Sequence, residues 1–189
     1  MASFKRNLVL QTKNKLHLKP NKASVLICIY QNTDGKACFA LMERADDNSV
    51  HSGQICLPGG KTEKLDYSNW STAVRETEEE IGINKNDLSF VKELSSIYIP
   101  PSNFNVFPFI GLTAETPDFK PQISEVESVI EVSLKAVMNA KHQIITTVKT
   151  SYGLSVSVPA FNFNGHIVWG ATAMILMEII YLFNLILKK

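Results

Sequence analysis

The stretch that decides the fold is Arg75-Glu76-Thr77-Glu78-Glu79-Glu80-Ile81-Gly82-Ile83. At about 100° per residue, Glu76, Glu79 and Glu80 fall on one face of a helix, because they are three and four positions apart. The opposite face carries residues at the spacing of a buried helical stripe, namely Trp70, Ala73, Val74, Thr77 and Ile81. We therefore expect a helix that is capped by Asp66 or Ser68 and ends at Gly82.

The carboxylate face of this predicted helix indicates a metal site. Three carboxylates so close together repel one another unless a cation lies between them. Oxygen-only ligands suit a hard divalent cation such as Mg²⁺ or Mn²⁺, and substrate phosphates commonly complete its coordination shell. We predict Glu76, Glu79 and Glu80 as the metal ligands. The alternative is a solvated helix face, since Glu is a strong helix former.

Outward from this helix, the chain of 189 residues has the length of one domain, predicted over 23–189 after a polar, basic lead-in over 1–22. A hairpin turn at Asp34-Gly35 separates two expected strands, 25–30 and 37–44. Further strands are expected at 90–99, 106–113, 126–132, 144–148 and 154–158, and a closing helix at 171–187. Many strands with few helices favour an α/β or α+β sandwich.

The overall composition is that of an ordinary globular protein, with 45% hydrophobic residues, 20% charged residues and a net charge of +1. Nothing in that balance requires nucleic acid or an anionic membrane as a partner. Three cysteines without metal-site or disulfide spacing favour reduced thiols and a cytoplasmic location. Residues 1–20 carry no long apolar core, so we expect no secretory signal there.

The closing helix is almost wholly apolar from Trp169 to Leu187 and approaches the length of a membrane span. Glu178 stands in its middle, where a carboxylate in lipid costs about 2.5 kcal/mol or more. We therefore expect a core helix whose spare apolar face contacts a second copy in a homodimer. A membrane anchor is the alternative.

The segment from Gly60 to Ile83 resembles the Nudix box, G-x5-E-x7-R-E-U-x-E-E-x-G-U, in which U is aliphatic. The matching residues are Gly60, Arg75, Glu76, Glu79, Glu80, Gly82 and Ile83. Three departures stand beside them. Asp66 takes the place of the first glutamate, eight residues rather than seven separate it from Arg75, and Thr77 replaces the aliphatic residue.

The stretch before the box resembles the extra motif of the coenzyme A pyrophosphatase branch of that family. Arg44, Ala45, Gly53 and 57–60 fit its pattern, whereas Ser49 occupies the place of its second arginine. The run Trp-Gly-Ala-Thr-Ala at 169–173 is also similar to a segment common in this branch.

This resemblance implies a Nudix-type α/β/α sandwich with a mixed central sheet, a catalytic helix after a Gly-Gly loop and an apolar C-terminal helix. It implies a hydrolase that uses Mg²⁺ or Mn²⁺ to cleave the diphosphate of a small nucleotide substrate. For this branch that substrate is coenzyme A, cut into 3′,5′-ADP and 4′-phosphopantetheine. A dinucleotide or nucleotide-sugar pyrophosphatase and a non-catalytic nucleotide-binding module remain as alternatives.

The residue roles follow from the same resemblance. Arg75 is expected to anchor the helix and orient a glutamate through an ion pair, and Asp66 to hold the loop or a metal-bound water. Substrate binding is assigned to Arg44, Gly59, Gly60 and His51, and Glu125 is the candidate general base. For Arg44, His51 and Glu125, an ordinary surface position is the alternative.

Overall fold

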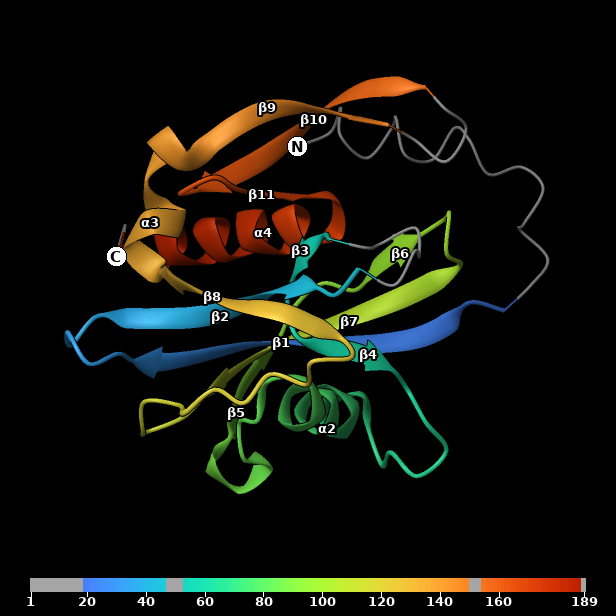
Figure 1. Cartoon of the computed structure of the whole chain (residues 1–189), viewed down its shortest axis with the longest axis vertical. Coiled ribbons are helices and arrows are strands. Elements are labelled where there is room, and N and C mark those ends of the chain that lie inside the picture. Colours follow the sequence, from blue (N-terminus) through green and yellow to red (C-terminus); the bar gives the residue numbers. More distant parts are fainter. Residues whose placement is uncertain (1–18, 47–52, 150–153, 188–189) are drawn as a thin grey trace.

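A computed structural model describes residues 19–46, 53–149 and 154–187 (Figure 1). Its main sheet has eight strands: β1 (Asn21–Gln31), β2 (Ala37–Arg44), β3 (Ile55–Cys56), β4 (Gly59–Lys61), β5 (Ser89–Glu93), β6 (Ile97–Ile99), β7 (Phe104–Leu112) and β8 (Val126–Ser133). The central order is β3-β2-β1-β7-β5, with β4 paired to β1, β6 to β7 and β8 to β2. Strands β1 and β7 run parallel and their other neighbours run antiparallel, so the sheet is mixed as expected.

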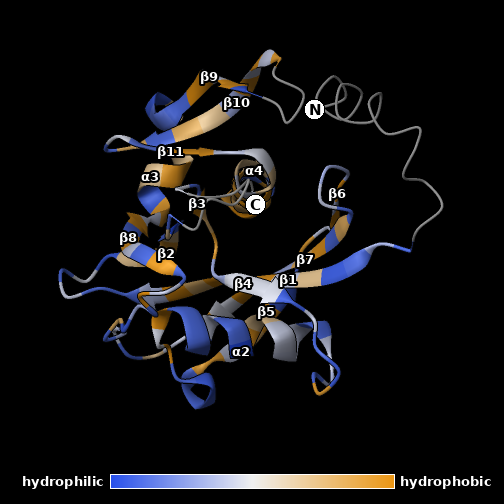
Figure 2. Cartoon of the chain, turned by 45° about the vertical axis from the view of Figure 1, so that its right-hand side comes forward, coloured by the Kyte–Doolittle hydropathy of each residue, from blue (hydrophilic) through white to orange (hydrophobic). Residues whose placement is uncertain are grey.

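Helices cover both faces of this sheet. Helix α2 (Asn69–Ile81) packs on one face and helix α4 (Gly170–Leu187) on the other. A separate antiparallel sheet of β9 (Gln143–Lys149), β10 (Ser155–Phe163) and β11 (His166–Trp169) lies over the far side of α4 (Figure 2). Short helical turns α3 (Leu134–Met138), η1 (Lys85–Asp87) and η2 (Ala140–His142) complete the order. The predicted α/β/α sandwich is confirmed, with this small sheet as an additional layer.

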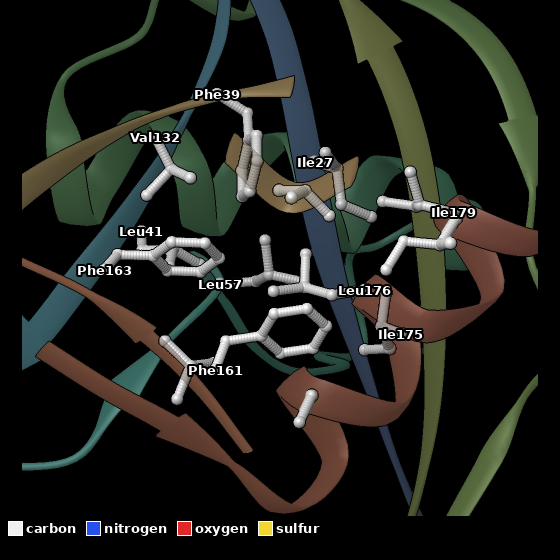
Figure 3. Packing of buried hydrophobic residues seen from close by; sticks show 14 of the residues in the cluster. Ile27, Phe39, Leu41, Leu57, Val132, Phe161, Phe163, Ile175, Leu176 and Ile179 are labelled. Carbon is white, nitrogen blue, oxygen red and sulfur yellow. The ribbon is translucent and has the colours of Figure 1, made fainter. Parts of the chain in front are cut away.

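Alternation along β1 divides the core into two parts. Leu26 and Cys28 pack toward α2, whereas Ile27 packs toward α4. Figure 3 shows the part of the core on the α4 side, in which Phe161 and Leu176 pack against side chains of the main sheet. Helix α4 and the small sheet thus bury the face of the main sheet that α2 leaves open.

Helix α2 begins and ends at residues that the sequence marks. Ser68 is its N-cap, because its side chain accepts from Ser71 N at 3.0 Å and Ser71 Oγ in turn accepts from Ser68 N at 2.9 Å. Gly82 ends the helix in the left-handed conformation at φ 76° and donates to Glu78 O at 3.0 Å. Of the two predicted caps, Ser68 is confirmed, and Asp66 has another role.

The strand predicted over 90–99 is wrong as a single element, since β5 ends at Glu93 and β6 begins at Ile97. Leu94, the residue after β5, lies opposite Pro108 of β7, and a proline has no backbone N–H to donate to a neighbouring strand. Leu94 N still donates to Pro108 O at 2.9 Å, and the next residue, Ser95, turns to α4 instead. The strand predicted over 154–158 is also too short, because β10 continues to Phe163 to pair with β11.

Helix α4 is, within the described residues, the one helix long and apolar enough to cross a membrane, and 33% of it is buried in the protein. The carboxylate in the middle of this helix is hydrogen-bonded within the protein: Glu178 Oε1 accepts from Ser95 N at 3.1 Å and from Ser95 Oγ at 3.0 Å. The buried face of α4 includes Ile175, Leu176 and Ile179. Met177, Tyr181 and Leu185 to Leu187 are exposed, which matches the expected spare apolar face.

Candidate active site

Strand β4 places two glycines directly beneath α2. Gly59 N donates to Glu80 Oε2 at 2.7 Å, so the backbone itself holds that carboxylate. At Gly59, where φ is +142°, a Cβ would lie 2.5 Å from Val25 Cα of β1. At Gly60 a Cβ would lie 2.5 Å from Glu76 Cδ. Each position therefore needs glycine for a different reason, close strand packing at Gly59 and room for a carboxylate at Gly60.

Arg75 connects the loop before α2 to two of its glutamates. Its Nε donates to Asp66 Oδ1 at 3.0 Å and its Nη2 to Asp66 Oδ2 at 3.1 Å. Nη2 also contacts Glu76 Oε1 at 2.9 Å and Lys61 O at 3.2 Å. Nη1 contacts Glu79 Oε2 at 2.8 Å. The guanidinium is thereby committed to positioning carboxylates.

Asp66 holds the loop rather than joining the glutamates. Besides Arg75, it accepts from Thr72 Oγ1 at 2.9 Å and from Glu63 N at 2.8 Å, and its side chain is only 5% exposed. The Arg75 hydrogen bond is the main cause that lowers the pKa of Asp66 to about 2. The role of Asp66 is therefore structural, since it holds the loop before α2 against the first turns of that helix.

Glu80 is a buried carboxylate without an ion-pair partner among the described residues. Burial raises its pKa to about 8; the charges of Glu76 and Glu125 act in the same direction, and Gly59 N–H and Arg44 oppose them. Burial likewise raises the pKa of Glu76, against the effect of Arg75. Two inward carboxylates that repel each other are suitable oxygen ligands for a hard divalent cation.

The predicted trio of ligands is not preassembled. Within residues 19–46, 53–149 and 154–187, no three acidic, histidine or cysteine side chains stand at metal-binding spacing. The reason is Glu79, whose side chain is 57% exposed and turned to Arg75, while Glu76 and Glu80 point to the glycines. For Glu79 to join a metal site, its bond to Arg75 has to open.

Arg44 and Glu125 lie at the edge of the same site. Arg44 ends β2 and stands opposite Val126 of β8, and the adjacent Ala45 N donates to Glu125 O at 2.9 Å. Both charges act on Glu80, although the residues are far from α2 in the sequence. His51 and Ser49 lie outside the described residues.

Two features of the site are not indicated by any local pattern in the sequence. One is the pairing of Glu80 with Gly59 N–H, which joins residues 21 positions apart. The other is Ser24, a buried hydroxyl opposite Gly60, which directly precedes the strand predicted over 25–30. The three cysteines are free in the structure, and burial raises the pKa of the Cys28 and Cys56 thiols to about 12.

Comparison with known proteins places this site in context. A family model described as NUDIX domain matches residues 20–147. Nudix hydrolase 15, mitochondrial, of Arabidopsis thaliana is 30% identical over 183 residues, which are 94% of this chain and 64% of that protein. This chain therefore spans less than two thirds of the length of that relative. Mitochondrial coenzyme A diphosphatase NUDT8 of Mus musculus is 28% identical over 90% of this chain and 81% of that protein.

Among solved structures, a MutT/nudix family protein from Enterococcus faecalis aligns with a TM-score of 0.61 and 16% identity, over 100% of this chain and 70% of that one. At this identity the likeness concerns the fold alone. It covers the whole chain, including the part beyond the residues that the family model matches.

Proposed function

Because this chain belongs to the Nudix hydrolase family, we propose that it hydrolyses the diphosphate bond of coenzyme A or a derivative, releasing 3′,5′-ADP and 4′-phosphopantetheine. The observation that carries the chemistry is the pair of inward carboxylates, Glu76 and Glu80, held against Gly60 and Gly59. The substrate assignment is supported by the similarity to a coenzyme A diphosphatase over 90% of the chain. The partial motif around Arg44 points to the same branch.

Nudix hydrolases generally use divalent metals such as Mg²⁺ or Mn²⁺. In this chain Glu76 and Glu80 would hold the cation, with Glu79 joining them once it leaves Arg75. When bound, such a cation neutralises the diphosphate and lowers the pKa of a water molecule.

The remaining groups bind and orient. Gly59 N–H fixes Glu80 Oε2, and Arg75 fixes Glu76 and the loop through Asp66. Arg44, at the open end of β2, faces the phosphates, since a guanidinium forms charge-assisted hydrogen bonds to phosphate oxygens. Glu125 is exposed beside the inner carboxylates and takes the proton of the attacking water.

One sequence feature favours a second candidate, a diphosphatase for other nucleoside diphosphate derivatives. Ser49 stands where the coenzyme A branch has an arginine, and a hydroxyl cannot supply a cation to the 3′-phosphate that distinguishes coenzyme A. The same reasoning predicts weak discrimination between coenzyme A and dephospho-coenzyme A.

The test is a substrate panel with the purified chain. Coenzyme A, dephospho-coenzyme A, ADP-ribose and diadenosine tetraphosphate are each incubated with Mg²⁺ or Mn²⁺, and products are separated by chromatography. We expect 3′,5′-ADP from coenzyme A, and loss of the reaction in excess EDTA and in Glu80→Gln.

Glu78→Gln is the matched control for that variant, because Glu78 lies on the same helix but pairs with Lys85 away from the glycines. It should retain the rate. Turnover of another substrate alone would overturn the coenzyme A assignment. No turnover of any diphosphate would favour a binding module.

The cytoplasmic location stays a prediction, since the names of both curated relatives above place those proteins in mitochondria. A homodimer through the exposed face of α4 also stays a prediction.

A further inference from the structure

The hydroxyl of Ser24 is buried without a hydrogen-bond partner, the one such side-chain polar atom among the described residues. The residue is 0% exposed. A buried donor that makes no hydrogen bond destabilises the fold, and such groups in native proteins call for an explanation. In this protein the explanation lies in its neighbours.

Ser24 lies on the α2 side of the main sheet, the side on which the Glu76 carboxylate lies against Gly60. Strand β1 alternates, and Leu26 and Cys28, two and four residues on, pack on that side. Ser24 is the cross-strand partner of Gly60 in the antiparallel β1–β4 pair, where facing Cα atoms are about 4.5–5.5 Å apart. Side chains of facing residues share one side of the sheet, and at Gly60 that side holds the Glu76 carboxylate.

Glu76 has the complementary deficiency. Its Oε1 accepts from Arg75 Nη2 at 2.9 Å, whereas Oε2 has no hydrogen-bond donor among the residues that the structure describes. Oε2 is also the carboxylate atom closest to the position of a Gly60 Cβ, which is the side that Ser24 flanks. An unpaired donor and an unpaired acceptor therefore stand over the same pair of strands.

We propose that Ser24 is a positioning residue, whose Oγ–H donates to Glu76 Oε2 when Glu76 ligates a divalent cation. The inference rests on the proposed function, because it takes Glu76 as a metal ligand. Carboxylates that ligate metals are themselves held by hydrogen bonds, and these outer contacts tune the affinity. The absence of a side chain at Gly60 leaves the space through which the two groups meet.

The test is Ser24→Ala, measured for metal binding and for stability without metal. Mn²⁺ binding is titrated by calorimetry and by the electron paramagnetic resonance signal of free Mn²⁺, and thermal unfolding is followed in EDTA. We expect the Kd for Mn²⁺ to rise about 10-fold. The Tm in EDTA should rise by about 2–4 °C, because the substitution removes an unpaired buried hydroxyl.

Weaker metal binding together with a more stable metal-free protein distinguishes a positioning role from a packing role. A hydroxyl that serves packing alone would give a lower Tm in EDTA, or an unchanged Kd for Mn²⁺, and either result overturns the proposal. In a Glu76→Gln background, Ser24→Ala should leave the Kd unchanged, since the effect acts through Glu76; a further loss of affinity there would contradict the proposal. Ser96→Ala, at an exposed serine between β5 and β6, is the control and should change neither quantity.

The role of Ser24 and the proposed function can be refuted separately. If the unaltered chain binds Mn²⁺ and Ser24→Ala binds it equally well, the role of Ser24 is wrong and the proposed function stands. If the unaltered chain binds no Mn²⁺, the role of Ser24 is wrong, and the substrate panel with Mg²⁺ and Mn²⁺ decides the proposed function separately.

Discussion

Gly60→Ala is predicted to impair catalysis while leaving the fold intact. A Cβ at this position would lie 2.5 Å from Glu76 Cδ, whereas an ordinary contact is about 3.5–4.0 Å. The carboxylate therefore has to move by about 1 Å, and a displacement of that size at a reacting centre costs about 100-fold in rate. The backbone tolerates alanine, because Gly60 does not have a positive φ.

Stability should change little, because two small effects oppose each other. Replacing glycine by alanine at a compatible position stabilises a protein by about 0.4–1 kcal/mol through the unfolded chain. The displaced group is the far end of a flexible side chain, so the steric cost in the folded state is of similar size. We expect the free energy of unfolding to stay within about 1 kcal/mol of its original value.

The assay compares kcat/KM for coenzyme A with Mg²⁺ and thermal unfolding, for Gly60→Ala, Glu76→Asp and the double variant. Shortening Glu76 by one methylene withdraws the carboxylate from the new methyl group, so the double variant should be more active than Gly60→Ala alone. Full activity in Gly60→Ala would refute the reasoning, since the contact between Gly60 and Glu76 would then have no part in catalysis.

Four further predictions concern the carboxylates of the site, the substrate preference and the exposed face of α4. Glu79→Gln should lose at least about 100-fold in rate with unchanged circular dichroism, and full activity would remove Glu79 from the site. Asp66→Asn should lower the free energy of unfolding at pH 7 by about 2 kcal/mol, because the folded-state pKa of about 2 lies below the ordinary 3.8. That contribution is complete above pH 4 and is lost as the pH falls from about 4 to about 2, so unfolding curves of the two proteins should converge there and not at neutral pH. Ser49→Arg should increase the preference in kcat/KM for coenzyme A over dephospho-coenzyme A, and a strong preference before the substitution would assign the 3′-phosphate to another cation. The exposed apolar face of α4 should give a dimer in analytical ultracentrifugation, whereas recovery in a detergent-dependent membrane fraction would contradict this.

Local patterns in the sequence were enough to predict the elements that carry the site. The Ser68 cap, the left-handed Gly82 and the inner stripe from Ala73 to Ile81 define α2 within a single stretch of chain. The hairpin at Gly35 and strand β2 were predictable for the same reason, since turn residues and neighbouring apolar runs act over a few positions. The glutamates on one face of α2 follow from helix geometry alone.

Contacts between residues far apart in the sequence decided where β5 ends, which partner Glu178 has and how α4 packs. The break between β5 and β6 depends on Pro108 of the neighbouring strand, and the carboxylate of Glu178 is satisfied by Ser95, 83 positions away. The small sheet of β9, β10 and β11 is what shows that α4 packs between two sheets, and the sequence of the helix alone does not indicate this.

The different positions of the three glutamates depend partly on tertiary contacts. The three are equivalent by helical spacing, yet Gly59 N–H binds Glu80 and the space at Gly60 accommodates Glu76, and both glycines belong to β4. Glu79 instead pairs with Arg75, four residues earlier on the same helix. Helix spacing determines only which side chains share a face. Which carboxylates turn inward depends on burial and on the glycines of β4, and these meet α2 only when the chain has folded.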